Sequence, residues 1–482
     1  MADIILVQPK VREVKVIKYE VGVPLALLSM CRYLAKDYNI KIIDQRIDKH
    51  WKKNLVKELK KNPLCVATTS MTGNPIKYAL EASKIVKQNS DVPVVLGGIH
   101  ASLLPKQTLE NPYIDFVVKG EGEVTLYELV KSLEKNISFK GIKGVWYKEN
   151  GKIKPNLDRN FVDLNKLPEI PFNIINMKDY ISRDGKRGIY LQTSRGCPGR
   201  CTFCYNSPFY KHTWRSLNPE KTQEMIKHVV NDFNVKSICF VDDDFFVDTR
   251  RIKEILKGII NENLDVKWYA NSRINSIIHE KKKFFSLLKQ AGCERLNIGI
   301  ESGSSRILKL IQKDITTNQI VEFNKKIRRI DISLAYSFIC GFPTETKKEL
   351  RKTINLMFRL KKDNPNTIIL PITFYTPTPN TKLFDLSVKL GLKKPVKLEQ
   401  WIGFDQVKVN LPWLSEKEIN NLYSLTFTSL FLNNDFTSYT TNESLLFKIL
   451  FKLYKPIALY RTKNLYFKYM IENEIRKLFS RF

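Results

Sequence analysis

The sequence predicts an α/β protein built from two successive α/β units and a helical end. Short β-like apolar runs alternate with amphipathic helical patterns over residues 1–140 and again from residue 188 onward, and mainly helical patterns remain after about residue 395. Such alternation is typical of parallel strands joined by crossover helices. We therefore expect a doubly wound parallel sheet at 1–140, a proline-containing linker at 141–187, a partial (βα)6 barrel at 188–394 and a helical C-terminal region at 395–482.

Five apolar runs of the first unit are predicted strands: residues 4–8, 40–44, 64–70, 92–98 and 114–120. Sheets of this class bind ligands beyond the carboxyl ends of their strands. Three successive strand ends carry small or hydroxylated residues, which let a large ligand approach the backbone, although they also suit tight turns. No G-x-G-x-x-G motif follows the first strand, so a nicotinamide site has no support. These strand-end residues are Thr68, Thr69, Ser70, Gly97, Gly98, Gly120 and Glu121.

Six further runs predict the strands of the second unit: residues 188–193, 237–242, 266–271, 295–301, 334–341 and 367–375. Six βα units indicate a partial barrel of the TIM type, whose functional residues belong at the carboxyl ends of the strands. The segment TSRGCPGRCTFCYNSPF follows the first of these strands directly.

The net charge and the placement of the cysteines indicate the kind of partner and the cellular compartment of the protein. The chain has 80 Lys and Arg residues against 49 Asp and Glu, which gives a formal net charge of +31. This excess indicates either an anionic partner or a basic composition that is spread over solvated faces. Cysteines outside the 193–209 segment stand singly in apolar runs, where buried thiols behave as small hydrophobes. The N-terminus lacks a signal-peptide pattern, and no run approaches the roughly 18 apolar residues of a membrane span. We expect a cytoplasmic protein.

Cys197, Cys201 and Cys204 form a C-x3-C-x2-C group that can bind a soft metal centre. A structural zinc site normally has four protein ligands, and His212 is the nearest candidate for a fourth. No second cysteine pair follows, however. A 4Fe–4S cluster held by three cysteines instead leaves one iron open to a substrate or cofactor.

The C-x3-C-x2-C group has Phe203 directly before its last cysteine and follows the first strand of a βα series. In these features it resembles the cluster motif of the radical S-adenosylmethionine (radical SAM) superfamily. The resemblance implies that the amino and carboxylate groups of SAM chelate the open iron. One electron, supplied by a reductant such as flavodoxin or ferredoxin, then cleaves SAM into methionine and a 5′-deoxyadenosyl radical. The protein positions the reactants and excludes water.

Five later segments resemble the SAM-facing motifs of that family, in the same order: FVDDDFF (240–246), NSRINSI (271–277), NIGIESGS (297–304), FICGFPTET (338–346) and TFYTPTPNT (373–381). Taken one at a time, each could equally be a solvated acid or a buried ion pair. The resemblance implies a SAM-binding set of Phe203, Asp242, Asp243, Arg273, Glu301 and Ser302.

The first unit resembles the Rossmann-like cobalamin-binding domain that is fused ahead of some radical SAM barrels. The resemblance rests on GGIHASLLPK and IDFVVKGEGEVTLYEL. It implies that cobalamin lies over the strand-end residues named above. The cobalt-coordinating D-x-H-x-x-G motif is absent, and His100 is no substitute for it; in this subclass cobalamin is thought to bind without that histidine.

These resemblances imply a cobalamin-dependent radical SAM enzyme, most typically a methyltransferase acting at an unactivated carbon. An oxidative cyclase or carbon–carbon coupling enzyme is the alternative within the superfamily. The positive charge also suggests an RNA-modifying enzyme. Methylthiotransferases of that kind carry a second three-cysteine set, whereas only Cys31 and Cys65 precede residue 190 here. We therefore do not expect nucleic acid as a partner.

The C-terminal tail, residues 444–482, has two interpretations. Apolar residues recur at helical spacing before Pro456, with lysines on another face, and a second basic, aromatic-rich stripe follows. Such helices suit the surface of an anionic membrane, in which case the substrate would be a lipid, isoprenoid or pigment. Alternatively, they pack on the barrel and close its open side, with a small-molecule substrate reaching the site from solution.

Overall fold

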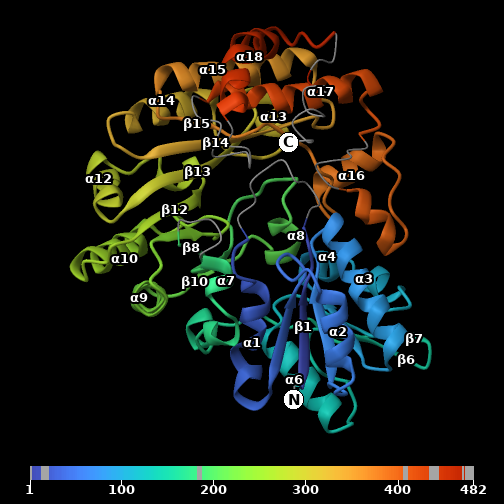
Figure 1. Cartoon of the computed structure of the whole chain (residues 1–482). Coiled ribbons are helices and arrows are strands. Elements are labelled where there is room, and N and C mark those ends of the chain that lie inside the picture. The colour runs from blue at the N-terminus through green and yellow to red at the C-terminus, as the bar shows by residue number, and fades with distance from the viewer. Residues whose placement is uncertain are drawn as a thin grey trace.

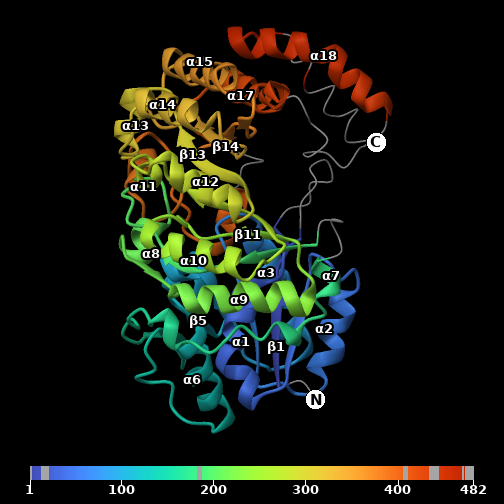
Figure 2. The same cartoon turned by 90° about the vertical axis from the view of Figure 1, so that its left-hand side faces the viewer.

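The computed structural model describes residues 3–11, 21–181, 187–404, 411–433, 445–468 and 472. The N-terminal unit lies at one end of the molecule, the barrel strands lie in the middle, and the last helices lie at the opposite end (Figures 1 and 2). This order in space follows the order of the three predicted regions.

The N-terminal unit is a doubly wound sheet, as predicted. Its strand order is β2-β1-β3-β4-β5-β6-β7, and the first five strands are parallel. Alternate residues of β1 face opposite layers: Ile5 and Val7 pack in the core that contains α2 and α3, whereas Ile4 and Leu6 pack against α1 and α6. The elements are β1 (Ile4–Gln8), α1 (Leu25–Asp37), β2 (Ile40–Asp44), α2 (Trp51–Leu59), β3 (Cys65–Thr69), α3 (Asn74–Asn89), β4 (Val94–Gly97), α4 (Gly98–Leu103), α5 (Pro105–Leu109), β5 (Phe116–Val118) and α6 (Glu123–Glu134).

The sheet continues beyond residue 140, where the sequence analysis placed the start of a linker. Strands β6 (Val145–Glu149) and β7 (Lys152–Pro155) add an antiparallel hairpin to β5. Its two turn residues are Asn150 and Gly151, with φ of 50° and 73°. An Asn-Gly pair at positive φ is the preferred two-residue hairpin turn, because its twist matches that of the flanking strands.

The second unit is a partial barrel of parallel strands, which confirms the predicted fold class. Its order is β8-β11-β12-β13-β14-β15, with β16 paired to β14. The last predicted strand is divided at Pro371, which has no N–H for the ladder. The strands are β8 (Gly188–Leu191), β11 (Ser237–Phe240), β12 (Lys267–Ser272), β13 (Cys293–Glu301), β14 (Ser333–Cys340), β15 (Ile368–Ile369) and β16 (Thr373–Phe374). The barrel helices are α9 (Pro219–Phe233), α10 (Thr249–Asn261), α11 (Ile274–Ile277), α12 (Lys282–Gln290), α13 (Ser305–Leu310), α14 (Thr317–Ile327) and α15 (Lys347–Asp363).

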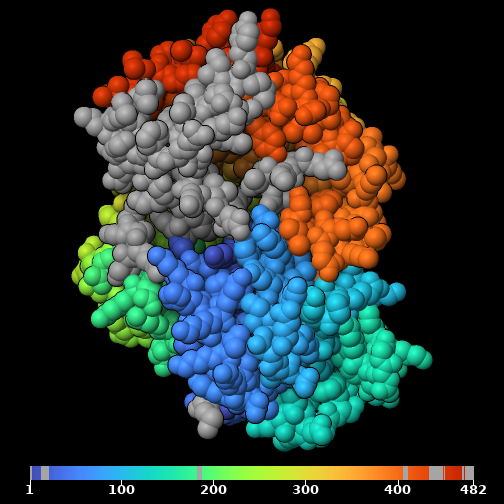
Figure 3. All heavy atoms as spheres, turned by 45° about the vertical axis from the view of Figure 1, so that its right-hand side comes forward, coloured from blue at the N-terminus to red at the C-terminus, as the bar shows by residue number. Residues whose placement is uncertain are grey.

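The C-terminal region is helical, and its first part returns to the N-terminal unit. Trp401, on η3 (Leu398–Gly403), is buried in the core beside α3 and donates its indole N–H to Gln107 Oε1 at 2.6 Å. Asn380 donates to the Leu103 carbonyl at 2.7 Å. Figure 3 shows this orange segment resting on the blue N-terminal unit. Helix α16 (Lys382–Lys389) precedes this region, and its later elements are α17 (Glu416–Ser429), η4 (Leu430–Leu432) and α18 (Leu445–Asn464). Between the two units lie the short helices η1 (Leu164–Lys166), η2 (Phe172–Ile174) and α7 (Lys178–Ile181).

Candidate active site

The three cysteines lie in one loop whose base is clamped by a short hairpin. Strands β9 (Ser194–Gly196) and β10 (Trp214–Ser216) pair antiparallel on either side of the loop. Gly196 has a φ of +82°, and a Cβ there would lie 2.1 Å from the Thr213 carbonyl oxygen. Glycine is therefore required for the loop to close directly before Cys197.

The cysteine loop borders a cavity of about 520 Å³ inside the partial barrel. This cavity brings together the three cysteines and four of the residues predicted to contact SAM, namely Phe203, Asp243, Arg273 and Glu301. The cavity is lined by Cys197, Gly199, Cys201, Phe203, Cys204, Tyr205, Asn206, Asp243, Asn271, Ser272, Arg273, Arg295, Asn297, Ile298, Gly299, Glu301, Lys313, Ser337 and Leu370.

Buried ion pairs and hydrogen bonds hold the charged groups around the cavity. Glu301 has a φ of 69°, a strained conformation for a residue with a side chain, and pairs with Lys313 at 2.7 Å. Burial alone would lower the pKa of Lys313, but Glu301 raises it above its ordinary value, so the lysine stays charged. Arg273 donates to Cys201 Sγ at 3.0 Å, and Tyr205 donates its hydroxyl to Asp243 at 2.6 Å.

Two of the residues predicted to contact SAM lie outside the cavity lining. Asp242 is fully buried and accepts hydrogen bonds from the Thr193 backbone N–H, at 3.1 Å, and from the Ser194 hydroxyl. Ser302 is also fully buried, and its hydroxyl lies 3.2 Å from Thr353 Oγ1. Both side chains therefore hold segments next to the cavity in place.

The sequence analysis did not find Lys313, Asn271, Asn297 or Arg295 as cavity residues. The inward position of Asn297 and Arg295 follows from strand alternation in β13, whose intervening Leu296 is fully buried in the outer core. Lys313 lies between α13 and α14, and no local pattern marks it.

The donor set fits a cluster better than a single ion. Among the residues that the structure describes, no three His, Cys, Asp or Glu side chains are close enough to hold one metal ion. The three cysteines nevertheless border a single cavity. Burial raises the pKa of Cys197 to about 11, so a cationic centre is needed to hold it as a thiolate. A multi-iron cluster would be held by these three cysteines and would supply that cationic centre.

The predicted cobalamin-binding edge faces this loop. Strands β3, β4 and β5 are parallel neighbours. Ser70 directly after β3, Gly97 at the end of β4 and Gly120 two residues after β5 therefore lie at one edge of the sheet. Helix α4, which begins directly after β4, packs against α8 (Asn206–Tyr210), which begins two residues after Cys204. The cysteine loop and the strand ends are therefore adjacent.

Unsatisfied polar atoms and open space at this edge fit a large ligand. Ser70 Oγ and His100 Nε2 are buried without a hydrogen-bond partner. Gly120 has a φ of +83°, and a Cβ placed on it would meet no atom within 4 Å. Burial lowers the pKa of His100 to about 3, so its ring is neutral.

Other predicted cobalamin contacts are satisfied by the chain itself. Thr68 donates its hydroxyl to the Val7 carbonyl at 3.0 Å. A Cβ on Gly98 would lie 2.4 Å from Thr69 Oγ1, so that glycine is required by the loop whether or not a ligand is present. Glu121 pairs with Arg215 of the barrel at 2.6 Å.

Glu121 belongs to a buried ion-pair network, here called the interdomain network, that joins the two units. Its members are Glu121 and Glu123 of the N-terminal unit and Arg195 and Arg215 of the β9-β10 hairpin. Ser29 on α1 accepts a hydrogen bond from Arg195 at 3.0 Å and donates one to Glu123 at 3.0 Å. The hairpin that carries the cysteine loop is thus fixed to the strand-end edge.

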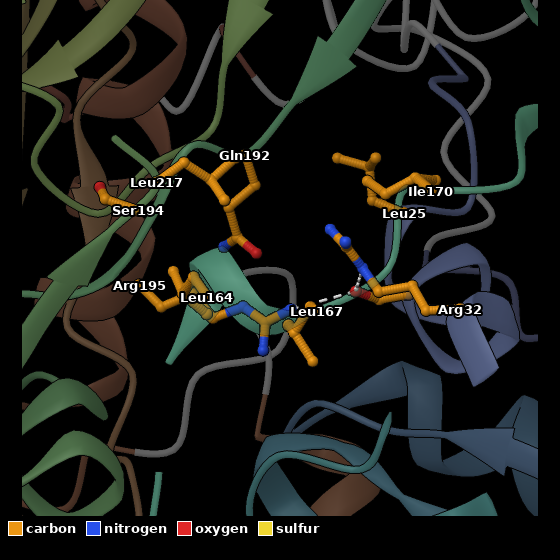
Figure 4. Close-up of a pocket in the computed structure, with 10 residues that line it drawn as sticks. Leu25, Arg32, Leu164, Leu167, Ile170, Gln192, Ser194, Arg195 and Leu217 are labelled. Atoms are coloured by element: carbon orange, nitrogen blue, oxygen red, sulfur yellow. Dashed lines mark hydrogen bonds between the residues drawn. The ribbon is translucent and has the colours of Figure 1, made fainter. Parts of the chain in front are cut away.

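A small pocket lies beside this network. In Figure 4, Arg195 from the barrel and Arg32 from α1 approach the pocket from opposite sides. Its volume is only about 20 Å³, which is room for about one water molecule. That pocket is too small for a substrate, whereas the barrel cavity of about 520 Å³ has room for one.

Residues 191–357 match the family model described as Radical SAM superfamily, and residues 16–130 match that of the B12 binding domain. An uncharacterized methyltransferase of Pyrococcus horikoshii is 31% identical over 435 residues, which cover 90% of this chain and 93% of the relative. The chain belongs to the radical SAM superfamily. It carries the B12 binding domain ahead of the barrel, so the predicted 4Fe–4S cluster, SAM and cobalamin are confirmed as the cofactors of this radical SAM enzyme.

Two solved structures share the fold of this radical SAM protein over most of the chain. The cobalamin-dependent SAM radical enzyme OxsB, with aqua-cobalamin and SAM bound, has a TM-score of 0.72 at 20% identity over 95% of this chain and 72% of that one. The methyltransferase TsrM from Kitasatospora setae has a TM-score of 0.65 at 17% identity over 82% of this chain and 80% of that one. A magnesium-protoporphyrin IX monomethyl ester cyclase of Cereibacter sphaeroides is 29% identical, but the match spans only 60% of that relative.

Proposed function

We propose that this protein is a cobalamin-dependent radical SAM methyltransferase that methylates an unactivated carbon of a small molecule, with a lipid, isoprenoid or pigment as the substrate class. The adjacency of the cysteine loop and the strand-end edge, through the contact of α4 with α8, carries the proposal. Methyl transfer needs the radical source and the methyl source to reach the same carbon. The Pyrococcus relative is likewise named a methyltransferase.

When bound, the cluster and SAM supply a hydrogen-abstracting radical, and cobalamin supplies the methyl group. In this proposal Cys197, Cys201 and Cys204 hold the cluster, and flavodoxin or ferredoxin delivers the electron. Asp243 and Glu301 are the acceptors that the cavity offers to the SAM amino group or ribose, and Arg273 is the donor it offers to the carboxylate. The ion pair with Lys313 holds the Glu301 side chain in place.

Counting the two SAM-derived products tests the proposal. Methyl transfer yields S-adenosylhomocysteine as well as 5′-deoxyadenosine, whereas cyclisation yields only the latter. In a Gly120→Asn variant we expect cobalamin uptake to fall several-fold and S-adenosylhomocysteine formation to fall with it, while SAM cleavage continues. Asparagine tolerates positive φ, so the new side chain occupies the open space at the strand end without breaking the loop.

Gly141→Asn is the matched control for that variant. Gly141 has a φ of +88° and equally open surroundings, but it lies outside the strand-end edge. We expect it to bind cobalamin as the wild type does. A wild-type protein that takes up no cobalamin under reducing conditions, or one that makes only 5′-deoxyadenosine with substrate, would rule out methyl transfer and favour the cyclase alternative.

We also propose that α18 contacts an anionic membrane surface. One face of α18 packs on the protein: Phe451 stacks on Phe431 at 4.2 Å, and Thr462 donates to Thr428 at 2.7 Å. The opposite face exposes an apolar stripe at helical spacing, beside the exposed Lys452 and Lys463. The stripe consists of Ile449, Leu453, Ile457 and Tyr460, which are 46%, 69%, 51% and 64% exposed.

A basic helix with one anchored face and one exposed apolar stripe suits an anionic bilayer surface. None of the described helices is long and apolar enough to cross a bilayer. The apolar residues predicted farther along the tail, such as Ile475, Leu478 and Phe479, lie outside the described residues.

Sedimentation with vesicles tests the contact. We expect the wild type to co-sediment with phosphatidylglycerol-containing vesicles but not with phosphatidylcholine vesicles, and salt to weaken this binding. A Leu453→Ser, Ile457→Ser variant should remain in the supernatant. Leu157→Ser, at a 78% exposed leucine of the N-terminal unit, should bind like the wild type. A wild type that ignores both vesicles contradicts the proposal, and a dimer lost in the double variant would assign the stripe to a second copy.

A further inference from the structure

Polar side chains on the inner face of the barrel form successive rows across neighbouring strands. Nearest the carboxyl ends is the row of Gly299, where a Cβ would lie 2.2 Å from Glu301 Oε1. Gly299 thus leaves the room that the Glu301–Lys313 pair fills. In the next row, Asn297 Nδ2 donates a hydrogen bond to Asn271 Oδ1 at 3.3 Å. The third row contains Arg295 and Tyr269, which are opposite each other in the β12-β13 register.

Arg295 is a cation of the cavity for which the described residues offer no carboxylate partner. Its guanidinium group stacks over the Tyr269 ring at 4.2 Å, and its Nε is buried without an acceptor. In the described part of the chain, no carboxylate lies within ion-pair distance of it, whereas Lys313 is paired with Glu301 and Arg273 with Cys201. A buried N–H without an acceptor is costly, and an arginine that is stacked on an aromatic ring presents its planar fork to carboxylate or phosphate oxygens.

We infer that Arg295 binds an oxyanion group, a phosphate or a carboxylate, of the substrate. The inference rests on the proposed function, because it takes the barrel cavity as the substrate site. Arg295 lies four residues before Gly299 on β13, nearer the amino end of the strand. The anionic end of the substrate is then expected on that side of the row at which the SAM-facing residues Glu301 and Lys313 meet.

Anion binding to the holoenzyme tests the inference without turnover. Inorganic phosphate and acetate are tested in parallel by equilibrium dialysis, and we expect one saturable site per chain for one of them. Saturable binding of phosphate would indicate a phosphate group on the substrate, and saturable binding of acetate would indicate a carboxylate. Arg295→Gln should weaken that binding at least tenfold, and Arg295→Lys should restore part of it, because lysine keeps the charge but not the fork. Arg328→Gln, at an exposed arginine at the end of α14, is the control and should leave binding unchanged.

Two results would overturn the inference: no saturable binding of either probe to the wild type, or equal binding to Arg295→Gln and the wild type. Thermal melts of each variant separate a lost subsite from a misfolded barrel. If the wild type binds the anion but transfers no methyl group, the proposed reaction is overturned and the Arg295 site stands.

Discussion

Replacing Cys201 with alanine is expected to abolish SAM cleavage and to leave the fold intact. The wild type, reconstituted under anaerobic conditions, should hold about four irons per chain. Cys201 is 6% exposed and lies in the wall of the barrel cavity, where its sulfur contacts Arg273. Without it, two cysteines are left to hold a cluster that needs three. Iron and sulfide analysis, electron paramagnetic resonance and circular dichroism together measure the outcome.

Cys31→Ala is the matched control for the cysteine variant. Cys31 is fully buried in α1, where its thiol donates to the Leu27 carbonyl. Burial raises its pKa to about 12, so it stays protonated and is no metal ligand. We expect this variant to bind the full complement of iron. Full cluster content and SAM cleavage in Cys201→Ala would contradict the cysteine assignment, and iron loss in both variants would point to general instability.

The fold could be predicted because its signals are local. The parallel strands of both sheets are short, largely apolar runs, and their alternation with helical patterns favours parallel pairing. The β6-β7 hairpin was placed in a linker, although Asn150-Gly151 between alternating residues is a strong local hairpin signal. Its role as an edge of the N-terminal sheet was not predictable, since pairing with β5 depends on distant residues.

The candidate site could be predicted only in part, because side-chain direction depends on the packing of distant segments. The three aspartates after β11 illustrate this limit. Asp242 turns toward Thr193, Asp244 accepts from the Ser276 hydroxyl at 2.6 Å, and only Asp243 lines the cavity. The sequence FVDDDFF does not distinguish the three. The pairing of Glu121 and Glu123 with Arg195, more than 70 positions away, is equally invisible to periodicity.

Replacing Arg195 with methionine is expected to cause a large loss of stability, about 3–5 kcal/mol. The Glu123 side chain is 1% exposed, so the variant leaves it buried without its counter-charge. Lys227→Met provides the comparison, because the Lys227–Glu262 pair is 51% and 50% exposed and should contribute less than about 1 kcal/mol. Urea unfolding followed by circular dichroism measures both variants.

The pH dependence of this loss separates an ion pair from simple packing. Burial alone would raise the pKa of Glu123, but Arg195 holds it below its ordinary value of 4.5. The pair therefore stabilises the wild type fully above pH 4.5, and this contribution is lost as the pH falls through the lower folded value. In Arg195→Met the strongest influence against burial is lost, so the pKa of Glu123 is higher than in the wild type and the variant regains stability as that carboxyl group takes up a proton. The deficit between the two proteins should thus narrow from pH 7 toward pH 4. A deficit that stays constant over this range would mean that Arg195 joins the units through the packing of its side chain, and that its charge does not hold the cysteine hairpin against the strand-end edge.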